Sequence, residues 1–121
     1  MPKEPFFLNR IKSVGYAFKG LFLLLWTEAS IKIQFFIALF VTGAGFYFDI
    51  SATEWAIQLL AIGLVMGIEG LNTAIEKLAD YIQPEHDKKI GFIKDISAGA
   101  VMIVSILATI VGLIIYVPKL I

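Results

Sequence analysis

Three long apolar runs, separated by short polar segments, dominate the chain. They cover residues 31–48, 55–82 and 96–117. As helices, runs of this length can cross the hydrocarbon core of a bilayer, which is about 30 Å thick. We expect Pro84 to stop the second helix and Pro118 to close the third, because proline cannot continue the helical hydrogen-bond ladder. The pattern predicts an all-α integral membrane protein with three transmembrane helices.

Residues 5–26 have a different pattern. Apolar side chains recur there at three- and four-residue spacing, while Arg10, Lys12, Tyr16 and Lys19 fall largely on the other side. This predicts an N-terminal amphipathic helix that lies in the membrane interface. With the three spans it would form a single membrane-embedded domain over residues 1–121.

Composition narrows the chemistry. Hydrophobic residues make up 59% of the chain, and ten basic residues balance ten acidic ones, so binding of nucleic acid has no electrostatic support. The chain has no cysteine and one histidine, His86, which excludes a disulfide framework, a thiolate site and a histidine cluster. Any bound metal would be held by oxygen atoms, which favours Mg²⁺.

The basic residues also predict the orientation in the membrane. Five of the ten lie before the first span or at its start, and the loop at 49–54 has none. Four more lie at the end of the second span or between it and the third, namely Lys77, Lys88, Lys89 and Lys94, and Lys119 at the far end is the exception. Cytoplasmic loops are the ones enriched in lysine and arginine. We therefore expect the N-terminus and the segment at 80–95 to face the cytoplasm.

Four polar residues enter the second run near its end: Glu69, Asn72, Glu76 and Asp80. At about 100° per residue, with Glu69 at zero, the other three fall at about −60°, −20° and +20°, so all four share one face. A solvated helix end would explain Asp80 and Glu76. It explains Glu69 poorly, because Glu69 lies about 21 Å along the helix from Trp55. A carboxylate at that depth indicates a functional site.

At the same membrane boundary we expect Glu28, Lys94 and Asp95 to join this face; Glu28 could also pair with Lys32, four residues on. Carboxylates suit Mg²⁺ and lysines suit phosphate oxygens, while a desolvated Glu69 suits a general base. This chemistry favours phosphoryl transfer to a lipid hydroxyl. Two other classes remain open, namely an intramembrane ion or proton relay and a structural membrane scaffold.

Several motifs carry a resemblance to a known family. The run from Glu69 to Glu76 reads Glu-Gly-Leu-Asn-Thr-Ala-Ile-Glu, and Asp80 and the segment at 94–101, Lys-Asp-Ile-Ser-Ala-Gly-Ala-Val, follow it. The segment at 15–21 reads Gly-Tyr-Ala-Phe-Lys-Gly-Leu, and Glu28-Ala29 comes next. In order and spacing these resemble the bacterial diacylglycerol kinase family, small three-span membrane kinases that include the undecaprenol kinases of Gram-positive bacteria.

The resemblance implies ATP- and Mg²⁺-dependent phosphorylation of a lipid hydroxyl at the cytoplasmic face of the bacterial inner membrane. It implies a homotrimer with active sites shared between subunits. Glu69 would be the general base, Glu28 and Glu76 would hold the metal, and the lipid would lie against Glu69, Trp55 and Ala98. The nucleotide site would be lined by Tyr16, Glu28, Asn72, Glu76, Glu85, His86, Asp87, Lys94 and Asp95.

The acceptor lipid is the point on which the motifs divide. Gly15-Tyr16 with Lys19-Gly20-Leu21 resembles the diacylglycerol branch, whereas the segments at 72–76 and 98–101 resemble the undecaprenol branch. We favour diacylglycerol, giving phosphatidic acid, with undecaprenol as the alternative. The chain departs from the family at 85–87, where it reads Glu-His-Asp and many members read Glu-Tyr-His, and at Phe92, where some members carry arginine.

Overall fold

The computed structural model describes residues 5–85 and 87–121, and these residues form four helices and no strand. The helices are α1 (Phe6–Thr27), α2 (Ala29–Tyr47), α3 (Ala52–Ile82) and α4 (Lys88–Leu120). By length and composition α2, α3 and α4 can each cross a membrane. The predicted all-α fold class with three spans is therefore confirmed.

Local sequence signals set both ends of α3. Ser51 and Glu54 form a capping box, in which the Glu54 N–H donates to Ser51 Oγ at 3.1 Å and the Ser51 N–H donates to Glu54 Oε1 at 2.9 Å. At the other end the chain is extended at Gln83, with φ −143° and ψ 91°. A residue before proline avoids the helical region, so Pro84 stops the helix as predicted.

The predicted limits of α1, α2 and α3 agree with the structure within three residues, but those of α4 do not. α4 begins at Lys88, eight residues before the predicted start, because the Asp87 carboxylate caps it. The prediction that Pro118 closes this helix is wrong, since α4 continues to Leu120. At this position, close to the end of the helix, proline removes a single hydrogen bond, the one from its missing N–H to the carbonyl of Ile114. The next carbonyl, that of Ile115, accepts from the Lys119 ammonium at 3.1 Å.

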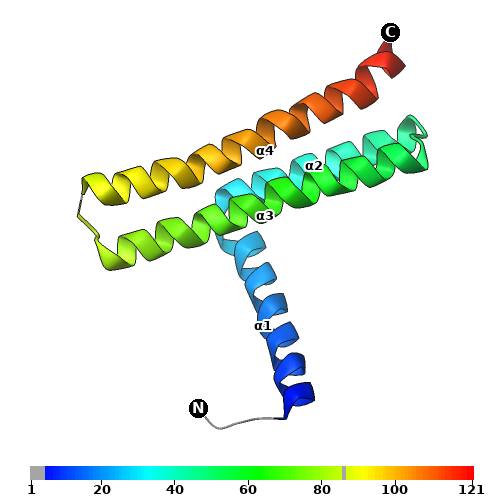
Figure 1. Ribbon diagram of the computed structural model, residues 1–121. Coiled ribbons are helices and arrows are strands. Elements are labelled where there is room, and N and C mark those ends of the chain that lie inside the picture. Colours follow the sequence, from blue (N-terminus) through cyan, green and yellow to red (C-terminus); the bar gives the residue numbers. More distant parts are fainter. Residues whose placement is uncertain (1–4, 86) are drawn as a thin grey trace.

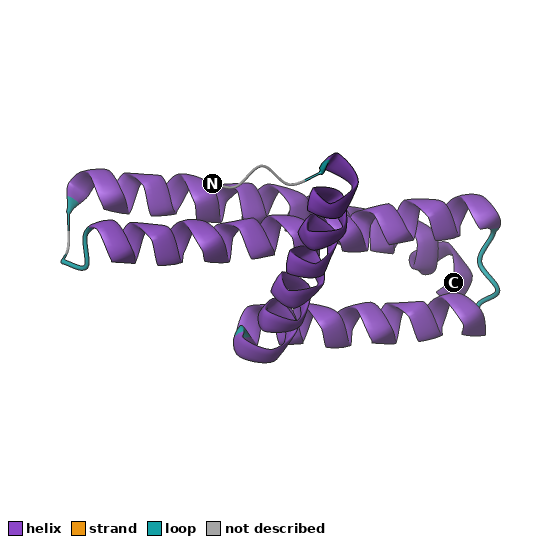
Figure 2. Cartoon of the chain, turned by 90° about the horizontal axis from the view of Figure 1, so that it is seen from below, coloured by secondary structure: helices purple, strands orange, loops and turns teal. Residues whose placement is uncertain are grey.

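The four helices form a three-helix bundle with one helix projecting from it (Figure 1). α3 and α4 run antiparallel from the loop that joins them, and α2 lies beside α3 (Figures 1 and 2). α1 leaves the bundle at Glu28, where the backbone is extended with φ −101° and ψ 119°. In a membrane crossed by α2, α3 and α4, a helix that runs across their direction would lie along the membrane surface, as the amphipathic pattern of α1 predicts.

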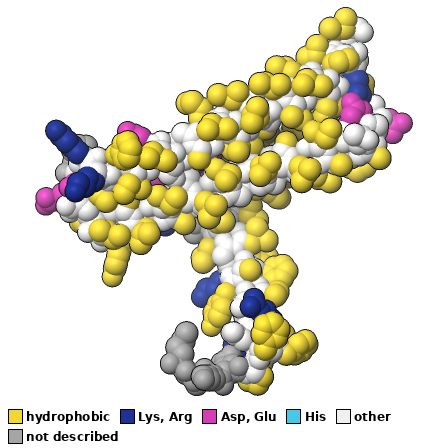
Figure 3. Space-filling view, in the orientation of Figure 1, with side chains coloured by type: hydrophobic (Ala, Val, Ile, Leu, Met, Phe, Trp, Pro, Cys, Tyr) yellow, Lys and Arg dark blue, Asp and Glu magenta, His cyan; other side chains and the backbone are white. Residues whose placement is uncertain are grey.

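Polar and apolar side chains are arranged inside out relative to a soluble protein. Apolar side chains cover the visible face of the bundle, and charged ones gather near its two ends (Figure 3). In contrast, within the described part of the chain the buried side chains include as many polar or charged residues as apolar ones: Gln58, Glu69, Asn72, Thr73 and Ser97. This is the arrangement expected in lipid, where apolar groups are already solvated and polar ones must face the bundle interior.

Candidate active site

The polar face of α3 changes from buried to exposed along the helix. Glu69 and Asn72 are each only 8% exposed. One and two turns further, Glu76 and Asp80 are exposed. The helix is continuous through all four residues, so the face keeps its register. This face thus begins with a carboxylate inside the bundle and ends with carboxylates at its surface.

The Asn72 side chain has hydrogen-bond partners for only part of its amide group. Its amide Nδ2 donates to Glu76 Oε1 at 3.1 Å, one turn further along α3. Its carbonyl Oδ1 is buried and has no hydrogen-bond partner within the described part of the chain. Buried polar atoms are normally paired, so an unpaired oxygen beside a carboxylate indicates a place for a cation or a donor.

Glu28 approaches α3 from the corner between α1 and α2. Its Oε1 lies 3.1 Å from the Nζ of Lys77, the residue after Glu76. The expected partner, Lys32, is therefore not the one that the fold selects. From the sequence, Lys77 was expected only among the cytoplasmic charges. Its position next to Glu76 is the one signal that could have placed it at the site.

The end of α1 is held against α3 beside Glu69. A Cβ atom added at Gly70 would lie 3.1 Å from Leu24 Cδ1, closer than an ordinary carbon contact. The glycine thus lets the last turns of α1 approach α3, and this contact brings Glu28 to the polar face.

α4 contributes one residue to this region through an ion pair. The Lys94 ammonium contacts the Asp80 carboxylate and joins α4 to the exposed end of the polar face. Asp95, which directly follows Lys94, and Ala98 are exposed, and Ser97 between them is buried. Thus Lys94 joins the α3 face within one chain, whereas Asp95 and Ala98 point away from the buried side of α4.

Other predicted site residues lie apart from this group. Tyr16 is 71% exposed and precedes Leu24 by eight residues, about 12 Å along α1. Trp55 packs against Phe46 at the other end of α3, with ring centroids 4.9 Å apart. Glu85 is exposed, Asp87 caps α4 through Oδ1, and His86 lies outside the described residues. One chain therefore brings together Glu28, Glu69, Asn72, Glu76 and Lys94, and not Tyr16 or Trp55.

The chemistry of these donors fits Mg²⁺. Two carboxylates, Glu28 and Glu76, and the unpaired oxygen of Asn72 are hard oxygen ligands. No group of three histidine, cysteine, aspartate or glutamate side chains that could hold a metal ion occurs within residues 5–85 and 87–121. Mg²⁺ commonly binds one or two carboxylates and completes its shell with phosphate oxygens and water, so a small donor set suits a metal that arrives with a nucleotide.

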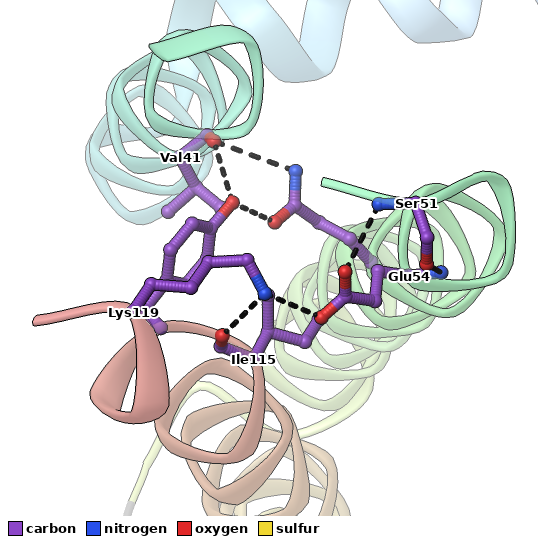
Figure 4. Close-up of polar contacts among 7 residues, drawn as sticks. Val41, Ser51, Glu54, Ile115 and Lys119 are labelled. Atoms are coloured by element: carbon purple, nitrogen blue, oxygen red, sulfur yellow. Dashed lines mark hydrogen bonds and ion pairs between the residues drawn. The ribbon is translucent and has the colours of Figure 1, made fainter. Parts of the chain in front are cut away.

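A second polar group, which the sequence analysis missed, occupies the opposite end of the bundle. The Tyr116 hydroxyl donates to Gln58 Oε1 at 2.5 Å, and its oxygen also lies 3.2 Å from the Val41 carbonyl oxygen. Nearby, Lys119 Nζ donates to Glu54 Oε2 at 2.8 Å (Figure 4). Gln58 falls at about −20° on the scale that places Glu69 at zero. This shared helix face is the sequence feature from which a buried role of Gln58 could have been predicted.

A cavity of about 460 Å³ lies between α2, α3 and α4 in this half of the bundle. Its α3 wall includes Gln58, Ile62 and Val65, which fall within about 40° of the direction of Glu69. The remaining wall is mostly apolar side chains of α2 and α4. An apolar space thus follows the face of α3 that carries Glu69, on the side away from the exposed carboxylates.

Comparisons with known proteins agree with one another. A family model described as "Prokaryotic diacylglycerol kinase" matches residues 15–116, a range that contains every predicted site residue. The undecaprenol kinase of Bacillus subtilis is 38% identical over 114 residues, 93% of this chain and 93% of that protein. The diacylglycerol kinase of Escherichia coli K12 is 33% identical over 104 residues, 86% of this chain and 85% of that protein. A diacylglycerol kinase of Synechocystis sp. is 33% identical over 113 residues, 93% of this chain and 65% of that protein.

Proposed function

Because the chain belongs to the prokaryotic diacylglycerol kinase family and is therefore a lipid kinase, we propose that Glu69 is the base for phosphoryl transfer from ATP to a membrane lipid. The observation that carries this proposal is the burial of Glu69, 8% exposed, one turn before the half-satisfied Asn72. A carboxylate inside the bundle, on the face that continues to Glu76, is placed to accept the proton of a lipid hydroxyl.

In the proposed reaction, the lipid hydroxyl gives its proton to a Glu69 carboxylate oxygen. The hydroxyl oxygen forms a bond to the γ-phosphorus, the bond between that phosphorus and the β–γ bridging oxygen breaks, and ADP leaves with the electron pair. Glu69 and Glu76 are separated by about 10.5 Å along α3. That separation allows the acceptor hydroxyl and the phosphate chain to occupy different ends of one helix face.

We assign the nucleotide and metal to the exposed end of this face. Glu28 and Glu76 would hold Mg²⁺, which when bound neutralises phosphate charge. Asn72 Oδ1 supports this assignment, since it is a buried acceptor beside Glu76 with no donor in the described chain. Lys94, now paired with Asp80, would turn to the phosphates, and Tyr16, Glu85, His86, Asp87 and Asp95 complete the proposed nucleotide site.

The lipid would approach Glu69 from the membrane, with Trp55 and Ala98 as further contacts. The cavity between α2, α3 and α4 supports a tail that runs along α3 away from Glu69. Two acceptors are candidates. The motif at 15–21 favours diacylglycerol, whereas the 38% identity to the undecaprenol kinase, against 33% to the diacylglycerol kinases, supports undecaprenol. The ion or proton relay has no support from the comparisons.

We further propose a homotrimer with shared sites, in the cytoplasmic membrane and with the sites facing the cytoplasm. The distance of Tyr16 from the polar face and the outward direction of Asp95 support sharing. Mixing Glu69→Gln subunits with Asp95→Asn subunits should restore part of the activity if these two residues meet across chains. Persistent inactivity in mixed oligomers, verified by differently tagged subunits, would argue for sites within one chain.

The decisive experiment measures transfer of labelled γ-phosphate from ATP with Mg²⁺ in mixed micelles, with diacylglycerol or undecaprenol as acceptor. Glu69→Gln should lower the rate at least about 100-fold, because a positioned base contributes that much or more. Binding of ATP should change little. The matched control is Glu54→Gln, a carboxylate at the opposite end of the same helix. Near-normal transfer by a folded Glu69→Gln protein would refute the assignment, and label in one lipid alone identifies the acceptor.

A further inference from the structure

Lys77 contacts the carboxylate to which the proposed function gives a metal ion. Its Nζ lies 3.1 Å from Glu28 Oε1, and this ion pair joins the last turns of α3 to the corner between α1 and α2. The Glu28 side chain is 23% exposed and the Lys77 side chain is 70% exposed. The anion is thus held in place while most of the cation remains in water.

The ion pair between Lys77 and Glu28 should add little to the stability of the fold. Exposed ion pairs contribute little to stability, since water screens them and two long side chains lose freedom. A second lysine, Lys32, lies one helical turn after Glu28, yet Glu28 pairs with the lysine that follows Glu76. The pair therefore joins one proposed metal ligand, Glu28, to the residue that directly follows the other, Glu76.

An ammonium at Glu28 Oε1 and a metal ion on the same oxygen exclude each other. When a metal ion takes Glu28 Oε1, Lys77 must leave that oxygen. Its long flexible stem allows the movement, and an ammonium is a good point charge for phosphate. Since Lys77 follows Glu76 directly, phosphates held at Glu76 would lie within its reach.

We propose that Lys77 is an exchangeable counter-ion of the active site. It neutralises Glu28 while the site is empty, and it binds the nucleotide phosphates once a metal ion replaces it on Glu28. This inference rests on the proposed role of Glu28 as a metal ligand. It assigns Lys77 to phosphate binding, although Lys77 is not among the residues predicted from the sequence to line the nucleotide site.

The exchange predicts two effects of opposite sign for Lys77→Gln. Binding of Mn²⁺ alone, measured by the paramagnetic resonance of the free ion, should become about threefold tighter, because a competing positive charge is gone. Binding of a non-hydrolysable ATP analogue with Mg²⁺, measured by calorimetry, should weaken about tenfold, because a charge-assisted contact to phosphate is lost. Lys77→Arg should stay close to the unaltered protein in both measurements. Lys32→Gln, which removes a nearby lysine outside this pair, is the matched control.

Each outcome decides between distinct roles. If Lys77→Gln weakens both kinds of binding, Lys77 only positions Glu28 and the exchange is refuted. If neither binding changes, the pair is an inert surface contact. Should Lys77→Gln fold poorly by circular dichroism, Lys77→Met keeps the length of the stem without the charge and serves the same test.

The proposed function has its own separate readout. If Glu28→Gln leaves Mn²⁺ affinity unchanged, Glu28 is not a ligand and the underlying assignment is wrong. If Glu28→Gln weakens Mn²⁺ binding but Lys77→Gln does not tighten it, only the exchange is wrong. In the double variant Glu28→Gln/Lys77→Gln, the tightening caused by loss of Lys77 should disappear, since the competition takes place on Glu28.

Discussion

Replacing Gly45 by alanine, which adds one methyl group, should measurably lower the stability of the bundle. It is buried on α2, under the ring of Trp55. A Cβ atom at this position would lie 2.7 Å from Trp55 Cη2, 2.8 Å from Trp55 Cζ2 and 3.2 Å from Ile50 Cδ1. Carbon atoms in contact normally lie about 3.5–4.0 Å apart. Gly45→Ala therefore requires the indole ring to move by about 1 Å.

The size of the effect follows from what restrains the ring. Trp55 also packs on Phe46, with centroids 4.9 Å apart, and it follows the capping-box residue Glu54. Overpacking of this kind costs about 1–3 kcal/mol. Replacing glycine by alanine in a helix also contributes about 0.5–1 kcal/mol of stabilisation, which opposes the cost.

Gly43→Ala is the matched control, because it lies two residues away on the same helix and a Cβ there meets nothing within 4 Å. Both variants gain the same helix propensity, so the difference between them isolates the contact with Trp55. We expect Gly45→Ala to be less stable than Gly43→Ala by about 1–3 kcal/mol. Tryptophan fluorescence during denaturation in detergent micelles would measure this difference. Equal stabilities would refute the close packing of Trp55 on α2.

Two further changes test other contacts. Gly70→Val should lower kinase activity more than Gly67→Val, because a side chain at Gly70 pushes Leu24 and the end of α1 away from Glu69, whereas a Cβ at Gly67 meets nothing within 4 Å; equal activities in the phosphoryl-transfer assay would contradict this role of the glycine. Tyr116→Phe should destabilise the protein by about 1 kcal/mol in the same denaturation assay, because buried Gln58 loses the donor to its Oε1; an unchanged midpoint would mean that this hydrogen bond contributes nothing to stability.

The sequence predicted those features that depend on spacing along one helix. The shared face of Glu69 and Asn72 follows from 100° per residue, and α3 is continuous through both. The start of α4 at Lys88 could also have been predicted, because aspartate is a common helix N-cap and Asp87 follows Pro84. The prediction instead placed the start where the apolar run begins.

Features that depend on how helices meet could not be predicted in this way. The pairing of Glu28 with Lys77 needs the corner at Glu28 to fold back on α3, and Lys32 is the nearer partner along the chain. The bond from Tyr116 to Gln58 joins residues 58 positions apart and depends on the rotation of α4 about its own axis. Neither the corner nor the rotation leaves a periodic signal in the sequence.

Two buried amides on α3 favour the proposed placement of the active site at one end of the bundle and not at the other. Gln58 and Asn72 are 3% and 8% exposed, and they point within about 40° of each other. Both polar atoms of Gln58 are satisfied inside the chain, Nε2 by the Val41 carbonyl at 3.4 Å and Oε1 by the Tyr116 hydroxyl. Asn72 has only the bond from its Nδ2 to Glu76, and its Oδ1 remains unpaired in the described chain. An unpaired polar atom inside a membrane protein costs free energy. A ligand can lower this cost at Asn72, whose Oδ1 has no donor among the described residues, but not at Gln58, whose oxygen and nitrogen are both paired.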